Sequence, residues 1–426
     1  MITRLISLMM VCVLLGLTAC APSVPVQAQV VKSDKARITA PSASANDLAE
    51  LAAGNSAFAF DLYQTIRSKD GNLFYSPYSI SLALAMTYAG ARGNTEAQMA
   101  DVLHFTLSQA RLHPAFNALD LALASRGQGA QGKDDKGFRL SIANSIWGQA
   151  DYKFLAAFLD ALAENYGAGL RLSDFKNASE ASRKIINDWV AEETEDRIKD
   201  LIPEGAITPL TRLVLANAIY FNASWLRQFE EENTIDAPFY LLDGSQIAVP
   251  TMRQTEFFGY ADGAGYQAVE LLYDGGEMSM VILLPDTGEL AAFEGALNSG
   301  VLEAILSNIE RTNITLHMPK FKYETTLGLT DILQDMGMTD AFSMSADLSG
   351  MDGTRDLFIT DVLHKAFVAV DEAGTEAAAA TAVIVGVKAM PAPPVEVKID
   401  RPFIYLIRDI ETGTILFVGR VLDPSA

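Results

Sequence analysis

The chain has 426 residues, of which 50% are hydrophobic and 20% are charged, and its formal net charge is −21. This acidic balance argues against nucleic acids and heparin-like polyanions as partners, because both require clustered Lys and Arg, and the basic residues here are scattered. Residues 46–424 contain no low-complexity linker and no internal repeat, so we predict one large domain rather than two or three.

The N-terminus has the pattern of an export signal. Arg4 is followed by an apolar run that ends in Leu17-Thr18-Ala19-Cys20. This run of about 15 residues is shorter than the ~20 needed to span a bilayer. Its last four residues resemble a bacterial lipobox, in which the Cys20 thiol takes the lipid; a plain cleaved signal peptide is the alternative. We therefore predict a signal peptide at 1–19 and a lipidated, flexible tether at 20–45. By resemblance to bacterial lipoproteins, the protein would be exported and held at the outer membrane through Cys20, or be extracellular.

After the tether, the hydrophobic periodicity predicts both helices and strands. Apolar residues at helical spacing predict a helix over residues 46–67, and similar patterns recur at 153–166 and 178–200. Residues 95–98 have the form of a capping box at the start of a further helix. Buried β-type runs predict strands at 214–221 and 278–284, and Leu316, Met318 and Phe321 lie near a further strand. Residues 403–407 and 415–421 flank a turn and are predicted to form a hairpin. Together these elements predict an α+β domain.

The sequence carries no recognisable catalytic or metal-binding motif. There is no G-x-S-x-G elbow, no metal-type spacing of His or Cys, and no phosphate-binding glycine loop. Of the four histidines, His364 lies in an apolar strand-like run, which is typical of a buried structural histidine. We therefore predict a protein that is not an enzyme and that uses no metal or cofactor.

The stretch from Asp371 to Lys388, DEAGTEAAAATAVIVGVK, has two structural interpretations. Its alanines favour a helix. As a strand, its alternate positions would place Thr375, Ala377 and Ala379 on one face, which is uncharged and carries only small or β-branched side chains. A segment that suits both an exposed position and a buried strand can act as a switch.

The same stretch resembles the hinge of the reactive-centre loop in inhibitory members of the serpin family. Further segments, in the same order along the chain, resemble other signatures of that family: residues 72–81, 90–99, 217–221 with Trp225, 401–403, 407–409 and 413–420. The resemblance implies the serpin fold, a single domain over 46–426 with three sheets and about nine helices. It also implies a reactive-centre loop over about 372–397.

The resemblance assigns three groups of residues to the movement of this loop. The loop hinge comprises Glu372, Gly374, Thr375, Ala377 and Ala379. The shutter, a polar cluster beneath the point where the central sheet would part, comprises Ser76, Ser79, Asn217 and His364. The breach, where the loop would first insert, comprises Trp225, Lys320 and Glu372; for the last two, a solvated surface pair of little energetic value is the alternative interpretation.

The implied activity is suicide inhibition of serine proteases, and of some cysteine proteases, by a monomer that forms a covalent complex. Counting Glu372 as the first of 17 residues places the scissile bond at Lys388–Ala389 and predicts a trypsin-like target. Val385 and Val387 are rival sites that would suit an elastase-like pocket. The alternative function is that of a non-inhibitory serpin, either a carrier or a surface-anchored binding protein. Such members usually have bulky or charged hinge residues, which are absent here.

Overall fold

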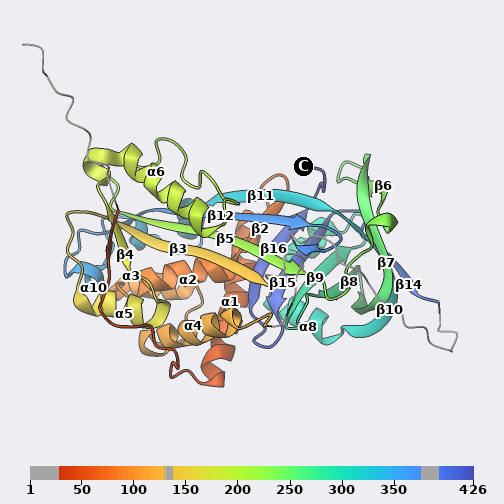
Figure 1. Ribbon diagram of the computed structural model, residues 1–426, viewed down its shortest axis with the longest axis horizontal. Helices are drawn as coiled ribbons and strands as arrows, with labels where there is room; N and C mark the ends of the chain where they lie inside the picture. The colour runs from red at the N-terminus through yellow and green to blue at the C-terminus, as the bar shows by residue number, and fades with distance from the viewer. Residues whose placement is uncertain (1–27, 129, 131–137, 376–392) are drawn as a thin grey trace, which may run out of the picture.

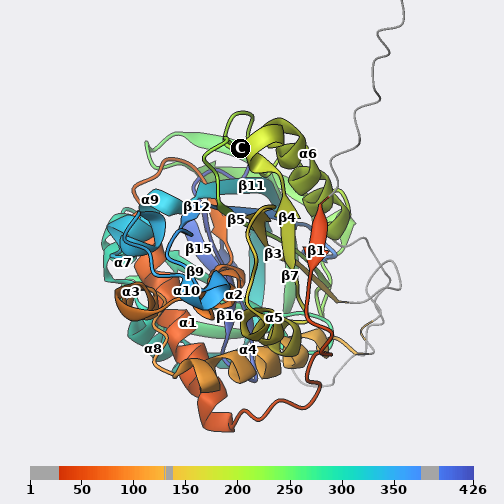
Figure 2. The ribbon, with the colours of Figure 1, turned by 90° about the vertical axis from the view of Figure 1, so that its left-hand side faces the viewer.

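Two β-sheets and the helices that cover them form the molecule (Figures 1 and 2). The computed structural model describes residues 28–128, 130, 138–375 and 393–426. Within these residues, α6 lies over one face of the first sheet, and α1, α2, α4 and α5 lie below the other face (Figure 1). None of the helices in this part of the chain is long and apolar enough to cross a membrane.

The helices follow the predicted pattern with shifted ends. The α-helices are α1 (Ala45–Ile66), α2 (Pro77–Tyr88), α3 (Gly93–Val102), α4 (Gln109–Ala124), α5 (Ala156–Tyr166), α6 (Phe175–Glu193), α7 (Leu290–Ala296), α8 (Ser299–Ser307), α9 (Leu329–Asp335) and α10 (Ser349–Asp352), with 3₁₀ turns η1 (Glu231–Asn233) and η2 (Asp340–Phe342). All residues of α2 are buried, as expected of a helix that is apolar on every side. The capping box predicted at 95–98 is wrong, because α3 begins at Gly93 and the Thr95 hydroxyl accepts a hydrogen bond from the Asp347 backbone N–H instead.

In the first sheet, two parallel strands pair along most of their length and are separated at one end by a two-residue strand; we call the junction between them the seam. Its seven strands are ordered β1-β4-β3-β5-β13-β12-β11. They are β1 (Gln29–Val31), β3 (Arg139–Gln149), β4 (Leu170–Ser173), β5 (Leu213–Ser224), β11 (Phe321–Gly328), β12 (Ile359–Val370) and β13 (Gly374–Thr375). β5 and β12 run parallel and pair directly from Leu213 with Ile359 up to Tyr220 with Phe367. β13 separates them only above that point.

Strand β5 is buried along its whole length because the sheet is covered on both faces. Val214, Ala216 and Ala218 pack in the cluster that includes α6, whereas Leu215 and Ile219 point into the larger core shared with α2 and the second sheet. This alternation is the period of two expected for a strand. Both edges of β5 are also paired, with β3 and with β12, so a new strand can join β5 only where one of these pairings ends or is broken.

The second sheet has nine strands and is divided by the long strand β7. It is ordered β14-β10-β7-β8-β9-β15-β16-β2, and β6 also pairs with β7. Its strands are β2 (Leu73–Tyr75), β6 (Ile235–Tyr240), β7 (Gln246–Gly263), β8 (Tyr266–Leu272), β9 (Met278–Pro285), β10 (Glu310–Pro319), β14 (Val395–Lys398), β15 (Phe403–Asp409) and β16 (Ile415–Val421). β6 and β8 pair with one edge of β7, at its start and at its end, and β10 pairs with the other edge, with β14 beyond it. Three sheets were predicted, whereas the structure joins all strands outside the first sheet into one sheet through β7. The predicted α+β fold is confirmed.

The tether predicted for residues 20–45 is wrong over its second half, because residues 28–45 are part of the folded domain. β1 pairs antiparallel with β4 and adds an outer strand to the first sheet. Further on, Arg37 donates to Asn117 at 2.8 Å and to Asp120 at 2.6 Å, both on α4. Ser44 then caps α1. A short polar segment gives little periodic signal, and its strand exists only because the edge of β4 offers backbone partners.

Candidate functional site: the hinge and the seam of the first sheet

The hinge begins with a tight turn after β12. The Asp371 carboxylate accepts hydrogen bonds from the backbone N–H groups of Ala373 and Gly374, at 3.0 and 3.3 Å. Gly374 then pairs with Ser224 at the end of β5. A Cβ atom at Gly374 would lie 2.2 Å from the carbonyl oxygen of Ala223, so only glycine allows this approach. The glycine of the predicted hinge is therefore where the chain enters the seam.

Thr375 already occupies the sheet. It pairs with Ala223 of β5 on one side and with Val370 of β12 on the other. Its side chain is fully buried, and its hydroxyl is 2.8 Å from the hydroxyl of Tyr273. Gly374 and Thr375 thus separate β5 from β12 at one end, while the two strands stay paired directly along the rest of the seam. The sequence places Thr375 on the uncharged face of a possible strand, and in the structure of the uncleaved chain this residue is already inside the sheet.

Glu372 is held by three groups around the breach. Its carboxylate accepts from Lys320 Nζ at 2.7 Å and from the Thr234 hydroxyl at 2.7 Å. Its backbone carbonyl accepts from the Phe229 N–H at 2.8 Å. Burial opposes ionisation of Glu372, but the hydrogen bonds from Lys320 and Thr234 outweigh it and lower its pKa. With a side chain only 8% exposed, Glu372 does not fit the alternative of a solvated surface pair.

Trp225 fixes the turn of the hinge to the end of β5. Its backbone N–H donates to the Ala373 carbonyl at 2.8 Å, and its indole N–H donates to the Asp371 carbonyl at 3.0 Å. The indole stacks on Tyr273, with ring centroids 4.6 Å apart, and Tyr273 in turn contacts Thr375. Of the three predicted breach residues, Glu372 is part of the turn between β12 and β13, and Trp225 and Lys320 are hydrogen-bonded to that turn.

The four predicted shutter residues lie in one buried network that crosses the seam. His364 on β12 and Asn217 on β5 are direct neighbours in the sheet, and the His364 Nδ1 is hydrogen-bonded to the Asn217 Oδ1. The Ser76 backbone N–H donates to His364 Nε2 at 3.2 Å. Asn217 Nδ2 donates to the hydroxyl and the carbonyl oxygen of Ser79, at 2.6 and 2.9 Å. The network ties β5, β12 and the start of α2 together at the level where the strands would have to separate.

These hydrogen bonds define the protonation state of His364. Nε2 accepts from a backbone N–H and is therefore unprotonated, whereas Nδ1 carries the proton that Asn217 accepts. Full burial lowers the pKa of His364 to about 3, so the imidazole is neutral at pH 7. Charging it in the folded state would require an uncompensated buried cation.

We expect His364 to make stability fall as the pH is lowered. Its pKa is about 3 when folded and about 6.5 when unfolded, so the unfolded chain binds the extra proton between these values. The stabilisation is complete above pH ~6.5 and is lost at about 1.4 kcal/mol per pH unit below it. His113, whose pKa burial lowers to about 4, adds a second such slope. In His364→Gln, whose amide can both accept and donate, the fall in the free energy of unfolding between pH 7 and 4.5 should be smaller by the His364 contribution, while the contributions of His113 and His317 remain. An unchanged slope would show that His364 is not the titrating group.

Several predicted residues lie outside the described part of the chain. These are Cys20, Ala377, Ala379, Lys388 and Ala389, together with the rival sites Val385 and Val387. In the described part, no group of three or more His, Cys, Asp or Glu side chains is arranged to hold a metal ion.

The sequence interpretation missed three residues of the site. Asn144 on β3 pairs in register with Asn217 and is hydrogen-bonded to it, which extends the shutter to a third strand. Thr234 and Tyr273 bind Glu372 and Thr375, more than 100 residues away in sequence. Asn144 could have been found as a polar residue within a buried strand, whereas Thr234 and Tyr273 have no distinctive sequence context.

The fold and the hinge together define the class: an α+β protein whose central sheet has taken in the first residues of its own loop. The sequence profile of the family described as Serpin (serine protease inhibitor) matches residues 53–424. Leukocyte elastase inhibitor A of Rattus norvegicus is 41% identical over 387 residues, which cover 88% of this chain and 100% of the relative. The chain therefore belongs to the serpin family.

Solved structures agree with this assignment. The native state of tengpin, a thermophilic serpin, has a TM-score of 0.82 at 28% identity and covers 93% of this chain and 100% of its own. Human thyroxine-binding globulin, solved as a complex, has a TM-score of 0.78 at 30% identity, and covers 89% of this chain and 99% of its own. These relatives thus include one named as an elastase inhibitor and one named as thyroxine-binding.

Proposed function

We propose that this protein traps a serine protease, as a monomer, through cleavage and insertion of its own loop. The observation that carries the proposal is the position of Thr375. It pairs with both β5 and β12 at one end of the seam, and the two strands pair directly with each other beyond it. The residues that follow on the same face, Ala377 and Ala379, are small and uncharged, so they offer no obstacle to burial.

In the proposed reaction the protease's serine attacks the carbonyl carbon of Lys388, and its proton passes to the protease's histidine. The C–N bond to Ala389 breaks, the proton goes to the leaving amine of Ala389, and an ester joins Lys388 to the protease. The freed strand from Thr375 to Lys388 then inserts beside β5. At ~3.3 Å per residue it would span roughly 45 Å, which is enough to carry the protease to the far end of the sheet.

The free-energy change on insertion of the cleaved loop is expected to be favourable. About ten new ladder hydrogen bonds at ~1 kcal/mol each give a drive on the order of 10 kcal/mol, with burial of the valines in addition. The uncleaved form would then be kept by a barrier rather than by equilibrium. The shutter network across β5 and β12 is a structural source for such a barrier, because the bond between His364 and Asn217 must break before the strands separate.

Incubation with trypsin tests the proposal. We expect a band heavier than either protein that survives boiling in detergent. Trypsin whose serine is replaced by alanine should give no such band, because no ester can form. If active trypsin yields only a nicked chain, the protein is a substrate and the carrier function of relatives such as thyroxine-binding globulin becomes the better proposal.

The proposal extends to a lipid anchor at Cys20, which would hold an exported bacterial protein at the outer membrane. The lipobox-like segment 17–20 supports it. When the chain is expressed in a bacterial host, Cys20→Ser should abolish incorporation of labelled palmitate and release from the signal peptide. Cys12→Ser, which changes the other cysteine, should leave both unchanged. Normal maturation and membrane association of the Cys20→Ser protein would rule out the anchor.

A further inference from the structure

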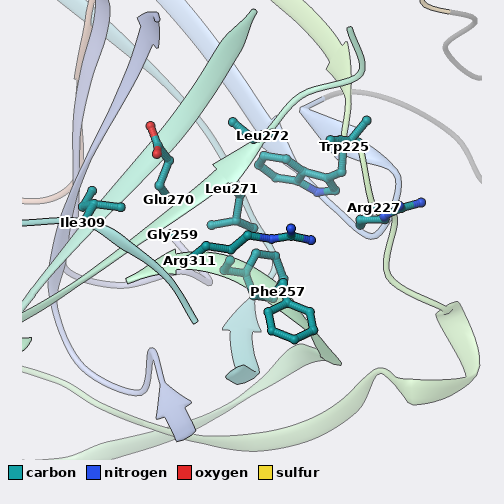
Figure 3. Close-up of a pocket in the computed structure, with 11 residues that line it drawn as sticks. Trp225, Arg227, Phe257, Gly259, Glu270, Leu271, Leu272, Ile309 and Arg311 are labelled. Atoms are coloured by element: carbon teal, nitrogen blue, oxygen red, sulfur yellow. The ribbon is translucent and has the colours of Figure 1, made fainter. Parts of the chain in front are cut away.

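A pocket with a volume of about 280 Å³ lies beside Trp225, bordered by the end of β5 and by β7, β8 and β10 (Figure 3). Its lining consists of Trp225, Leu226, Arg227, Phe257, Phe258, Gly259, Glu270, Leu271, Leu272, Ile309 and Arg311. The pocket is not part of the hinge or the shutter, but it shares Trp225 with the breach.

One part of the lining is apolar and aromatic. The buried side chains of Trp225, Phe258 and Leu271 are 2%, 6% and 2% exposed, and they provide a fixed apolar wall. Phe257 is 55% exposed at the rim, although it is a large aromatic residue. A flat, apolar ligand could cover the Phe257 ring and contact this wall, which would remove apolar surface from water.

The other part of the lining carries positive charge. The Arg311 guanidinium lies 5.0 Å from the centroid of the Phe257 ring. The Arg311 side chain extends across the pocket toward the Arg227 side (Figure 3). Neither arginine forms an ion pair with a carboxylate in the described part of the chain, in a protein whose net charge is −21. Two guanidinium groups at an apolar pocket are suited to a carboxylate, which arginine binds with two parallel hydrogen bonds.

The one acidic residue of the lining does not cancel this charge. Glu270 accepts from Arg408 at 2.8 Å and from the Ser279 hydroxyl at 2.8 Å. Both hydrogen bonds go to Oε1 and come from neighbouring strands of the same sheet, and the ion pair with Arg408 offsets the charge of Glu270. The charge that the pocket offers to a ligand therefore comes from Arg227 and Arg311.

We propose that this pocket binds a small aromatic carboxylate, with its ring system against Phe257 and Trp225 and its carboxylate on Arg311 and Arg227. The volume of about 280 Å³ is near the lower limit for small-molecule sites, which suits a fused two-ring acid rather than a larger ligand.

A ligand in this pocket would also touch the support of the hinge. Trp225 holds the carbonyl groups of Asp371 and Ala373, and the N–H of Leu226 donates to Leu272 at 2.9 Å. A ligand packed on Trp225 and Leu272 would favour the present arrangement, with only two hinge residues inserted. This second part rests on the proposed function: a saturating ligand should slow insertion, so that at least twice as much of the protein is cleaved without trapping trypsin.

Calorimetric titration of the full chain with 2-naphthoate tests the site itself, independently of inhibition. We expect binding that weakens about tenfold in Arg311→Gln, because a charge-assisted hydrogen bond is lost. The neutral isostere 2-naphthylmethanol should bind about tenfold more weakly to the unchanged protein. Arg253→Gln is the matched control, since Arg253 is an exposed arginine on β7 that does not line the pocket.

The possible outcomes distinguish a failure of the binding site from a failure of its coupling to the hinge. No heat with 2-naphthoate at about 1 mM, or equal affinity for the acid and the alcohol, would overturn the site. Equal affinity in Arg311→Gln and the unchanged protein, both with the same melting temperature, would do so as well. If 2-naphthoate binds but the ratio of cleaved to trapped product stays constant, the coupling to the hinge is wrong. If no trapping occurs without ligand, the failure belongs to the proposed inhibition and not to the pocket.

Discussion

Replacing Ala377 by arginine is expected to leave cleavage by trypsin intact while almost abolishing the covalent complex. Thr375 faces the interior, where it contacts Tyr273. Because strand side chains alternate, residue 377 would face the same buried side after insertion. An arginine there would be buried without a partner, at a cost of several kcal/mol. Insertion would slow by a few orders of magnitude, and hydrolysis of the ester would then release active protease.

The matched control is Ala378→Arg, which adds the same side chain one position later. On an inserted strand this residue points to the opposite face, toward the side of α6, so trapping should be reduced far less. Both variants leave Gly374 and Thr375 unchanged, so the hinge of the uncleaved protein keeps its contacts. Densitometry of the complex and the nicked chain measures the partition. A complex yield with Ala377→Arg equal to that of the unchanged protein would contradict insertion in this register.

The relation of sequence to structure differs between the parts of this site. The proximity of the shutter residues could be predicted because they lie in segments with distinctive local sequence, and the sheet brings His364 next to Asn217. The roles of the hinge and the shutter in loop movement stay predictions. The tether was mispredicted because β1 is three residues long and its stability comes from β4, far away in the chain. Local pattern cannot reveal a strand whose hydrogen-bond partners are all non-local.

Thr234 and Tyr273 illustrate the same limit at the level of side chains. Each makes one hydrogen bond to the hinge from a turn or a strand end, and the position of that group depends on the packing of both sheets. The depth of Thr375 was also beyond the sequence. A loop residue enters the sheet only if the backbone hydrogen bonds that it gains there outweigh the hydration that its backbone loses. This free-energy difference is small, and intrinsic strand propensity does not determine its sign.

Replacing Lys388 by glutamate is expected to abolish inhibition of trypsin-like enzymes. The trypsin-type pocket has an aspartate at its base, which attracts a lysine side chain and repels a carboxylate. Like-charge contact costs several kcal/mol, and a cost of about 4 kcal/mol corresponds to a ~1000-fold slower association. The rate of trypsin inactivation, measured from the loss of activity over time, should fall by that factor in Lys388→Glu.

Two further measurements decide between Lys388 and the valines as the cleavage site. Lys388→Arg should retain trypsin inhibition, because arginine carries the same charge to the same pocket. Inhibition of an elastase-like enzyme should be affected little by Lys388→Glu if that enzyme cuts after Val385 or Val387. Mass spectrometry of the peptide released on inhibition by trypsin should find Ala389 at its start. If trypsin is still trapped by Lys388→Glu and the peptide begins at residue 386 or 388, the scissile bond follows a valine, because the protease then binds a small apolar side chain instead of a cation.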